Sequence, residues 1–332
     1  MKPFVKYPGG KSKEIKVVNK YKPSQIERYF EPFIGGGAIF FDLIIEKNFI
    51  NDYSKDLIQL YSLIKKRSTK LKKYLIEFDR IWQEIETLTD FSKLEKYAWL
   101  DVNKLNSYFI ASKKRKEKLI EKINKTKAIV NDENKEKLFL TAKKTAFYMI
   151  VRDIYNHLRD NNEMHIASYF FLREYCYSSM FRFSKTGEFN VPYGGLSYNK
   201  KYLTTKIKYM YSIEMKEKLL KAQIYNMDFA RFLNKFEFNE NDFIFLDPPY
   251  DSDFSTYDKN VFDKTEQIRL RDTISNVKAK WMLIIKKTDF ISEIYENFYI
   301  YEYDKNYMVS FKNRNDKEVK HLLITNYNIQ GE

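Results

Sequence analysis

Residues 28–37, RYFEPFIGGG, run from a short apolar strand directly into three consecutive glycines. Residues 38–48 have the pattern of a helix, 49–54 that of a second strand with its turn, and 55–67 that of another helix. A strand, a glycine turn, a helix and a second strand in this order are typical of a doubly wound α/β sheet. Strand and helix alternate again only after residue 221. The predicted strands there lie within 222–229, 242–250, 280–289, 298–309 and 319–328.

The intervening segment has a different character. Residues 65–147 are helical in pattern and rich in lysine, with 22 Lys and Arg against 12 Asp and Glu between residues 65 and 145. Residues 148–220 are aromatic and basic and include the turn-rich stretch MFRFSKTGEFNVPYGG. We therefore expect one domain formed by residues 1–64 and 221–332, interrupted by a mostly helical region at residues 65–220.

The charge of the chain indicates an anionic partner. Lys and Arg number 59 against 45 Asp and Glu, which gives a formal charge of +14 and a pI near 9.3. Nucleic acid is the leading candidate for such a chain, and a lysine-rich genome is the alternative explanation. The helical zone accounts for most of the excess. It is either an element that faces DNA or a solvated helical hairpin.

Other classes of protein are excluded by simple observations. The single cysteine, Cys176, allows no disulfide framework and is expected to be a buried small residue. The first residues, MKPFVKYPGG, contain no apolar signal core, and no run of about 18 apolar residues is present. His157, His165 and His321 are scattered, so we expect no metal site. These features predict a soluble, cytoplasmic protein without a membrane partner.

The glycine turn at residues 35–37 permits close approach of the backbone to a ligand. A dinucleotide fingerprint would need glycine where Phe40 stands, so a pyrophosphate ligand is disfavoured. Asp52 ends the next strand, at a place where an acid reaches ribose hydroxyls in this architecture. The two interpretations are a ligand that has a ribose but no pyrophosphate, or a tight turn followed by a helix cap.

A P-loop at KYPGGKSK is rejected because Val5 occupies the position of its first glycine. Lys11 remains as a cation next to a glycine turn, suited to a carboxylate or a phosphate.

Residues 243–250, FIFLDPPY, form an apolar strand that ends on Asp247 and two prolines. Neither proline has an N–H, so the corner is rigid and rich in acceptors. Asp247 and the carbonyl of Pro248 could hold both hydrogens of an exocyclic amino group, and Tyr250 offers a flat ring for a base. The alternative is a proline turn that only terminates the strand.

Taken together and in this order, YPGGK, FEPFIGGG, ND and DPPY, with a basic aromatic insertion before the last, resemble the Dam-like (class alpha, D12) DNA adenine-N6 methyltransferase family. GEFNVPYGG is similar to its recognition region and KEVKHLLITNYN to its C-terminal strand, so the resemblance runs from residue 3 to about 328. It implies a Rossmann-like methyltransferase sheet that binds S-adenosylmethionine, with residues 65–220 as helical insertion and target-recognition region.

The resemblance also implies roles for individual residues. The positions matching cofactor contacts are Tyr7, Lys11, Glu31, Phe33, Gly35, Gly37, Asp52 and Asp247. The catalytic tetrad is Asp247, Pro248, Pro249 and Tyr250. Asp228 would flank the cofactor adenine. The expected reaction is methyl transfer from S-adenosylmethionine to N6 of an adenine flipped out of double-stranded DNA, with Tyr250 stacked on the base and no covalent enzyme intermediate.

The recognition region supplies candidate DNA contacts. Arg182, Lys185 and Asn190 are expected to meet base edges or phosphates, and Tyr193 either wedges the bases or holds the loop. The helical zone is longer than in compact family members, so we do not assume GATC as the target. The expected setting is a restriction–modification system or a phage or solitary methylase, with a cognate endonuclease as a functional partner that need not bind physically.

Two rival functions follow from the same residues. One is a cytosine-N4 or RNA amino methyltransferase, although the cytosine-N4 enzymes more often have serine at the position of Asp247. The other is a catalytically silent nucleic-acid-binding protein, against which the intact DPPY and glycine turn argue.

Overall fold

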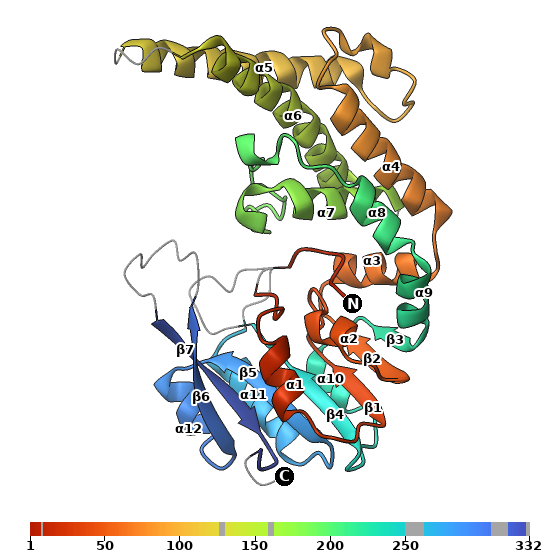
Figure 1. The fold of residues 1–332 in the computed structure, drawn as a ribbon, viewed down its shortest axis with the longest axis vertical. Helices are drawn as coiled ribbons and strands as arrows, with labels where there is room; N and C mark the ends of the chain where they lie inside the picture. Colours follow the sequence, from red (N-terminus) through yellow and green to blue (C-terminus); the bar gives the residue numbers. More distant parts are fainter. Residues whose placement is uncertain (8, 126–129, 159–162, 250–261, 307–317, 330–332) are drawn as a thin grey trace. The chain divides into compact units, whose positions relative to one another are not determined.

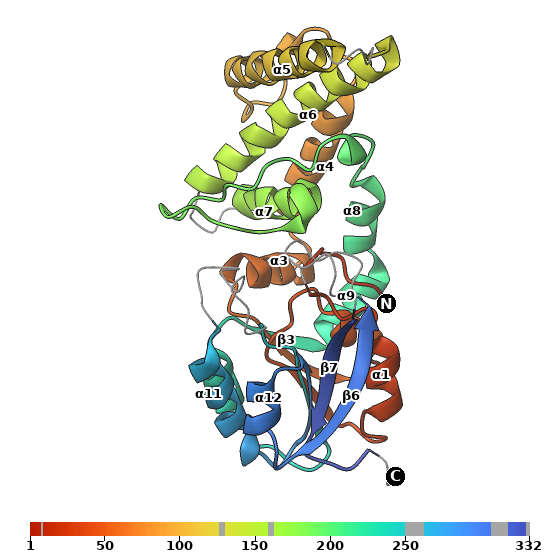
Figure 2. The same cartoon turned by 90° about the vertical axis from the view of Figure 1, so that its left-hand side faces the viewer.

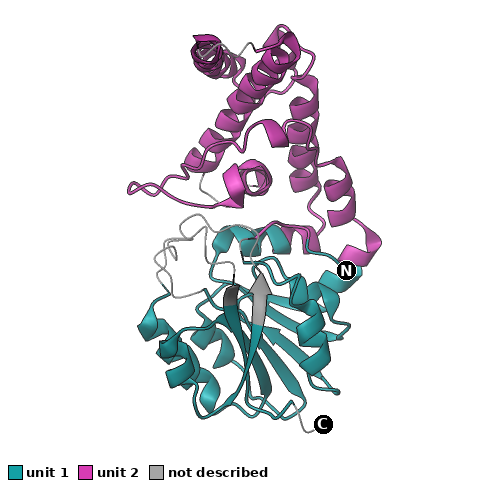
Figure 3. Ribbon diagram, turned by 60° about the vertical axis from the view of Figure 1, so that its left-hand side comes forward, with its two compact units in different colours: residues 1–3, 9–61, 217–332 teal, residues 4–8, 62–216 magenta. Residues whose placement is uncertain are grey.

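The computed structural model describes all residues except 8, 126–129, 159–162, 250–261, 307–317 and 330–332. The chain divides into two units: residues 1–3, 9–61 and 217–332 form unit 1, and residues 4–8 and 62–216 form unit 2 (Figure 3). From the sequence we expected the insertion to span residues 65–220, whereas unit 2 spans residues 62–216. Residues 4–8, expected in the sheet domain, also belong to unit 2. Within the described residues, no helix combines the length and the apolar character needed to cross a membrane.

Unit 1 contains a seven-stranded sheet with the order β3-β2-β1-β4-β5-β7-β6 (Figure 1). The strands are β1 (Arg28–Glu31), β2 (Lys47–Asn51), β3 (Ala222–Tyr225), β4 (Asp242–Leu246), β5 (Lys280–Lys286), β6 (Tyr299–Asn306) and β7 (Glu318–Thr325). The first five are parallel, whereas β7 runs antiparallel between β5 and β6. This arrangement confirms the predicted Rossmann-like α/β fold.

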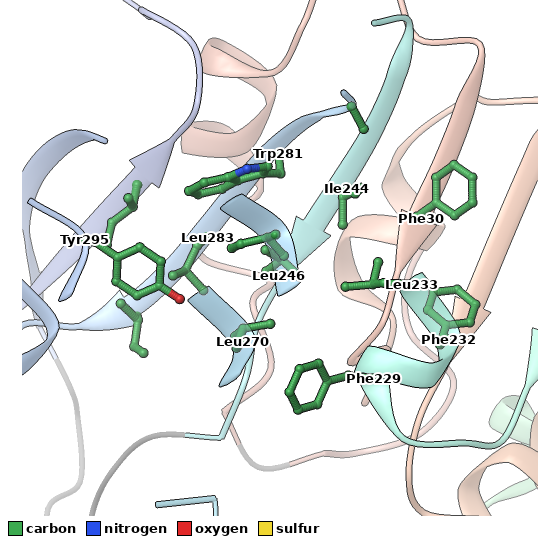
Figure 4. Close-up of a cluster of buried hydrophobic side chains, with 14 of the residues drawn as sticks. Phe30, Phe229, Phe232, Leu233, Ile244, Leu246, Leu270, Trp281, Leu283 and Tyr295 are labelled. Atoms are coloured by element: carbon green, nitrogen blue, oxygen red, sulfur yellow. The ribbon is translucent and has the colours of Figure 1, made fainter. Parts of the chain in front are cut away.

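Helices cover both faces of this sheet, which explains why the central strand β4 is buried throughout and β5 is buried except at its two ends. Helices α1 (Ile15–Tyr21) and α2 (Ala38–Asp42) lie on one side, and α10 (Phe229–Leu233), α11 (Lys264–Ser275) and α12 (Asp289–Ile294) lie on the other (Figures 1 and 2). Under α10–α12, Phe30, Ile244, Leu246 and Trp281 belong to one buried apolar cluster (Figure 4). All residues of β4 are buried.

The centre of the sheet is the pair β1 and β4. Phe30 stands opposite Ile244, and the guanidinium of Arg28 donates to both carboxylate oxygens of Asp242 at 2.7 and 2.6 Å. The chain order reverses between these strands, because β2 and β3 lie beyond β1 while β5 lies beyond β4. Ligands of doubly wound sheets bind outside the carboxyl ends of the strands at such a reversal.

One predicted element is too long. The helix expected over residues 38–48 ends at Asp42, and Leu43 is already extended, with φ −70° and ψ 142°. Strand β2 then starts at Lys47, which is paired with Arg28 of β1. The apolar run that suggested a longer helix includes Ile44, whose side chain is 94% exposed.

Unit 2 is mostly helical, as predicted. Its helices are α4 (Thr69–Glu84), α5 (Val102–Lys125), α6 (Asp132–His157), α7 (Glu163–Tyr175) and α8 (Thr204–Met210), with short 3₁₀ turns at Phe91–Leu94, Tyr177–Ser179 and Leu196–Tyr198. Helices α3 (Lys55–Lys65) and α9 (Ile213–Leu220) include the points where the chain passes between the units. The core of unit 2 is aromatic: Trp82 packs edge-on against Phe171 at 5.4 Å and beside Tyr175 at 4.4 Å.

Ion pairs are buried beside this core. The Lys144 side chain is fully buried and donates to the Trp82 carbonyl and to Glu86. Burial lowers the pKa of Lys144 to about 8, against the attraction of Glu86. Glu174 is likewise buried and accepts from Lys201 and Lys206, each at 2.6 Å. Several lysines of the basic insertion therefore form ion pairs and hydrogen bonds within unit 2.

Candidate active site

Three carboxylates gather at the carboxyl edge of the sheet because three neighbouring strands end there. Glu31 is the last residue of β1, and its strand partner in β2 is Ile50, two residues before Asp52. Asp247 follows directly after β4, the other neighbour of β1. The structure thus brings together Glu31, Asp52 and Asp247, which are far apart in the sequence.

Asp247 forms an ion pair with Lys11. The ammonium of Lys11 donates to Oδ1 of Asp247 and also to the carbonyl of Gly9, at 3.1 Å. The Lys11 side chain is 3% exposed, while that of Asp247 is 21% exposed. A buried ammonium needs such a partner. The pair therefore ties the N-terminal glycine turn to the DPPY corner.

Glu31 is buried and accepts a hydrogen bond from the hydroxyl of Tyr29 at 2.7 Å. Burial raises the pKa of Glu31 well above its usual range, the hydrogen bond from Tyr29 opposes this shift, and the nearby charge of Asp247 adds to it. Burial also raises the pKa of Tyr29. An uncompensated carboxylate in this position would be stabilised by a cation.

Another buried lysine, Lys218, interacts electrostatically with Glu31. Lys218 of α9 donates to the carbonyl of Leu43 at 2.7 Å and lies 4.3 Å from the ring centre of Phe40. Burial lowers the pKa of Lys218 to about 8, and the charge of Glu31 counteracts that shift.

The glycine loop is held by backbone contacts. The N–H of Gly35 donates to Asp52 at 2.9 Å, and the N–H of Ser54 donates to the other oxygen of the same carboxylate at 2.9 Å. Gly37 begins α2 in the left-handed region, with φ 72°. A Cβ at Gly37 would lie 2.7 Å from the hydroxyl of Tyr61, which donates to the Gly35 carbonyl at 3.3 Å. This loop requires glycine both for its φ and for space.

Asn51 joins three strand ends at this edge. Its side-chain amide donates to the carbonyls of Pro32 and Met227, each at 3.0 Å, and its carbonyl oxygen accepts from the N–H of Met227 at 3.0 Å. Asn226 donates to the backbone carbonyl of Asp52 at 2.8 Å. These bonds fix the glycine loop and Asp52 relative to the loop after β3.

Sequence reasoning missed Tyr29, Asn51 and Lys218. Tyr29 had a usable signal, because residues two apart on a strand share a face and Tyr29 precedes Glu31 by two. Asn51 is adjacent to Asp52, but an asparagine ending a strand has many ordinary roles. Lys218 had no signal, since it reaches Glu31 from a helix that the sequence places far away.

Phe33 and Asp228 have mainly local partners. The ring of Phe33 lies 5.4 Å from that of Phe229. Asp228 caps α10 by accepting from the N–H groups of Ala230 and Arg231. Its two oxygens also accept from Arg269, at 2.9 and 2.6 Å. The Asp228 carboxylate is therefore already engaged by protein groups.

Tyr7 belongs to unit 2, unlike the other predicted cofactor residues. The guanidinium of Arg173 lies 4.5 Å from its ring centre and 4.0 Å from that of Phe181. This stack joins the N-terminal segment to the turn-rich stretch that begins at Met180, and the cofactor role of Tyr7 stays a prediction.

The recognition residues differ in exposure. Arg182, Lys185 and Asn190 are exposed on a small hairpin in which Phe183 is bridged to Phe189. Tyr193 is buried, with its hydroxyl donating to Asn199 at 3.0 Å. Of the two roles considered for Tyr193, burial favours holding the loop and disfavours direct DNA contact. Cys176 is buried as expected, and burial raises the pKa of its thiol to about 12.

In the DPPY corner, Pro248 is buried and Pro249 is exposed, and the carbonyl of Pro249 accepts from the side chain of Gln267 at 3.1 Å. Tyr250 lies outside the described residues, so its predicted stacking role has no structural account here. Among the residues that the structure describes, no group of three or more His, Cys, Asp or Glu is placed to hold a metal ion.

The comparison with protein families agrees with this geometry. The model of the D12 class N6 adenine-specific DNA methyltransferases matches residues 7–122 and 90–309. The chain belongs to this family. Membership confirms the predicted reaction class, methyl transfer to N6 of adenine in DNA.

Individual relatives align over 89–98% of the chain. The Type II methyltransferase M.MjaIII of Methanocaldococcus jannaschii is 30% identical, over 98% of this chain and 99% of its own length. The Type II methyltransferase M.CviBI of Paramecium bursaria Chlorella virus NC1A is 28% identical, over 98% and 100%. The DNA adenine methylase of Haemophilus influenzae is 23% identical, over 89% and 82%.

The residues at the strand ends suit S-adenosylmethionine, the methyl donor that a D12 enzyme requires. Burial keeps the pKa of Glu31 raised despite the charge of Lys218, and the positive charge of an amino group would lower it. Asp52 follows β2, at a place where an acid can reach ribose hydroxyls in this architecture, and it accepts from the glycine loop that permits close approach. The donor set therefore fits the cofactor.

We predict that Gly37→Ala destabilises unit 1 by more than the ~1–2 kcal/mol that a left-handed non-glycine residue costs. The added methyl group would meet the Tyr61 hydroxyl at 2.7 Å and the Phe41 ring at 3.1 Å. Gly9→Ala is the matched control, because Gly9 has φ 75° but no atom within 4 Å of an added Cβ. Urea unfolding measures both variants, and equal losses would show that the loop has space for a side chain.

We predict that Glu31→Gln raises the stability of the ligand-free protein at pH 8. Because the folded-state pKa of Glu31 is raised above 4.5, ionisation destabilises the fold. The wild type therefore loses stability as pH rises from 4.5 through the folded-state pKa, and the variant does not. Thermal unfolding between pH 4 and pH 8 checks this, and a variant less stable than wild type at pH 8 would contradict it.

Proposed function

We propose that this D12 protein transfers a methyl group from S-adenosylmethionine to N6 of an adenine flipped out of double-stranded DNA, at one short target sequence. The observation that carries the proposal is the Lys11–Asp247 ion pair, at the strand ends where Glu31 and Asp52 also lie. It gives the DPPY corner an oriented carboxylate beside a set of groups that suits the methyl donor.

The residues of the corner act by position and charge. When bound, S-adenosylmethionine supplies an electrophilic methyl group on a sulfonium. Asp247 and the carbonyl of Pro248 accept the two hydrogens of the adenine amino group and orient its nitrogen. As N6 becomes positively charged, the carboxylate of Asp247 stabilises it. Lys11 keeps that carboxylate in place, and Tyr250 stacks on the flipped base.

Buried Glu31 has a role that its energetics support. A carboxylate whose pKa is raised by burial destabilises the fold when it ionises, so it is costly as a structural residue. We assign it to the amino group of the cofactor, whose positive charge would relieve that cost. Gly35, Gly37 and Phe33 form the loop beneath the same part of the cofactor, with Asp52 on the ribose.

For the target sequence, exposed Arg182, Lys185 and Asn190 are the proposed base and phosphate contacts of residues 65–220, the proposed recognition region. Helix α5 is proposed to contact phosphates, since Lys114, Arg115 and Lys118 are exposed on it. The setting is DNA in the cytoplasm, in a restriction–modification system with a cognate endonuclease or in a phage or solitary methylase.

We predict that Asp247→Ala reduces methyl transfer at least about 100-fold while DNA binding stays within about twofold, because the residue orients the reacting amine. The assay is transfer of labelled methyl groups to genomic DNA from a methylation-free host, with DNA affinity measured in parallel. Asp289→Ala, an exposed aspartate after β5, is the control and should retain full activity. A parallel loss of DNA binding would show that Asp247 is structural.

We predict that Lys114→Glu, Arg115→Glu and Lys118→Glu together weaken DNA binding and flatten its salt dependence. Each lost phosphate contact lowers the slope of log affinity against log salt by about 0.9. The matched control reverses three exposed basic residues of unit 1: Arg231, Lys235 and Lys278. If the α5 variant has the wild-type slope, α5 does not face DNA.

A further inference from the structure

Gln267 is a polar residue at a position of α11 that faces the hydrophobic core. In α11, Gln267, Leu270 and Ile274 lie three and seven residues apart, which places them on one face, and all three are 0% exposed. Leu270 and Ile274 pack in the apolar cluster under the sheet (Figure 4 labels Leu270). An apolar side chain is therefore expected at position 267, and the presence of a buried glutamine there has to be explained.

The side-chain hydrogen bond of Gln267 explains why a glutamine is found there. Its Nε2 donates to the carbonyl of Pro249 at 3.1 Å, whereas its Oε1 is buried without a hydrogen-bond partner in the part of the chain that the structure describes. The direction of the bond is certain from chemistry, because a proline carbonyl only accepts. A buried acceptor that lacks a donor is unfavourable. Methionine would fill the same space without that penalty, so the glutamine is explained by its donor alone.

The DPPY corner is short of donors. Pro248 and Pro249 fix φ and have no N–H, so the ψ torsions are the part of the corner that its own backbone donors cannot hold. At one end, Asp247 is held by the end of β4 and by Lys11. At the other end, the Pro249 carbonyl is held by Gln267. The two anchors bracket the peptide that carries the Pro248 carbonyl.

That middle carbonyl is the acceptor that the proposed function gives to the adenine amino group. Within the described residues, no hydrogen bond is formed to the Pro248 carbonyl, whereas the neighbouring Pro249 carbonyl is occupied. Gln267 therefore distinguishes two adjacent acceptors: it binds the Pro249 carbonyl and leaves the Pro248 carbonyl without a hydrogen bond among the described residues.

We propose that Gln267 is a positioning residue of methyl transfer, which anchors the Pro249 carbonyl so that the Pro248 carbonyl and Asp247 face the target amine. This inference rests on the proposed function. Gln267 itself touches neither the adenine nor the cofactor. It acts through the geometry of the corner, in the way that small misplacements of reacting groups reduce the rate of a reaction.

The test is Gln267→Met, which keeps the length of the side chain and removes both the donor and the unpaired acceptor. We expect the rate of methyl transfer to methylation-free genomic DNA, at saturating DNA and cofactor, to fall about tenfold or more. We expect the cofactor Kd to stay within about twofold and the melting temperature to be unchanged or higher, because the buried acceptor is gone. A structural role predicts a lower melting temperature instead.

Two further variants sharpen the comparison. Gln267→Glu keeps the shape but places a carboxylate against the Pro249 carbonyl, and should reduce the rate at least as much. Ile268→Ala changes the next, exposed residue of the same helix and should have no effect on the rate. Amide hydrogen exchange supplies a readout that does not depend on activity: in Gln267→Met, exchange at Asp247 should be faster, and exchange in β1 should be unchanged.

The outcomes separate this inference from the proposed function. A rate within about twofold of wild type, unchanged exchange at Asp247, or a rate loss matched by lost cofactor binding would overturn the role of Gln267. A wild-type protein that binds S-adenosylmethionine but methylates no DNA would overturn the proposed function. Hydrogen exchange then decides on its own whether Gln267 anchors the corner.

Discussion

The pairing of β1 with β4 is the interaction on which the rest of unit 1 depends. The two strands are locked in register by Arg28 and Asp242 at their amino ends, and the carboxyl ends then bring Glu31 and Asp247 to the same edge. The chain order reverses at this pair, and the carboxyl edge at such a reversal is where doubly wound sheets bind their ligands. A slip in register would separate the glycine loop from the DPPY corner.

The site contains charges that the fold alone would not favour. Glu31 is buried with its pKa raised, Lys218 is buried with its pKa lowered to about 8, and Lys11 is buried against Asp247. Taking such groups out of water costs free energy that only their partners and ligands return. Perturbed charged groups of this kind are typical of functional sites, and we propose that these serve a zwitterionic, positively charged cofactor.

Sequence patterns predicted the parts of this site that depend on local order. Gly35–Gly37, Asp52 and DPPY follow strands, and strand ends of a parallel sheet meet at one edge. The patterns did not predict Lys218 or Gln267, because these residues come from helices whose approach depends on tertiary packing. The patterns also predicted a helix longer than α2, because apolar Ile44 looked like a core residue although it is exposed. The role of Tyr193 could be chosen only once its burial was known.

The most direct test of the account is long-read methylation mapping of a methylation-free host that expresses this protein. We expect N6-methyladenine at one short sequence motif throughout the genome, which would establish the reaction and the target together. Absence of any modified base, from soluble protein that still binds S-adenosylmethionine, would contradict it and direct attention to RNA or to a silent DNA-binding role.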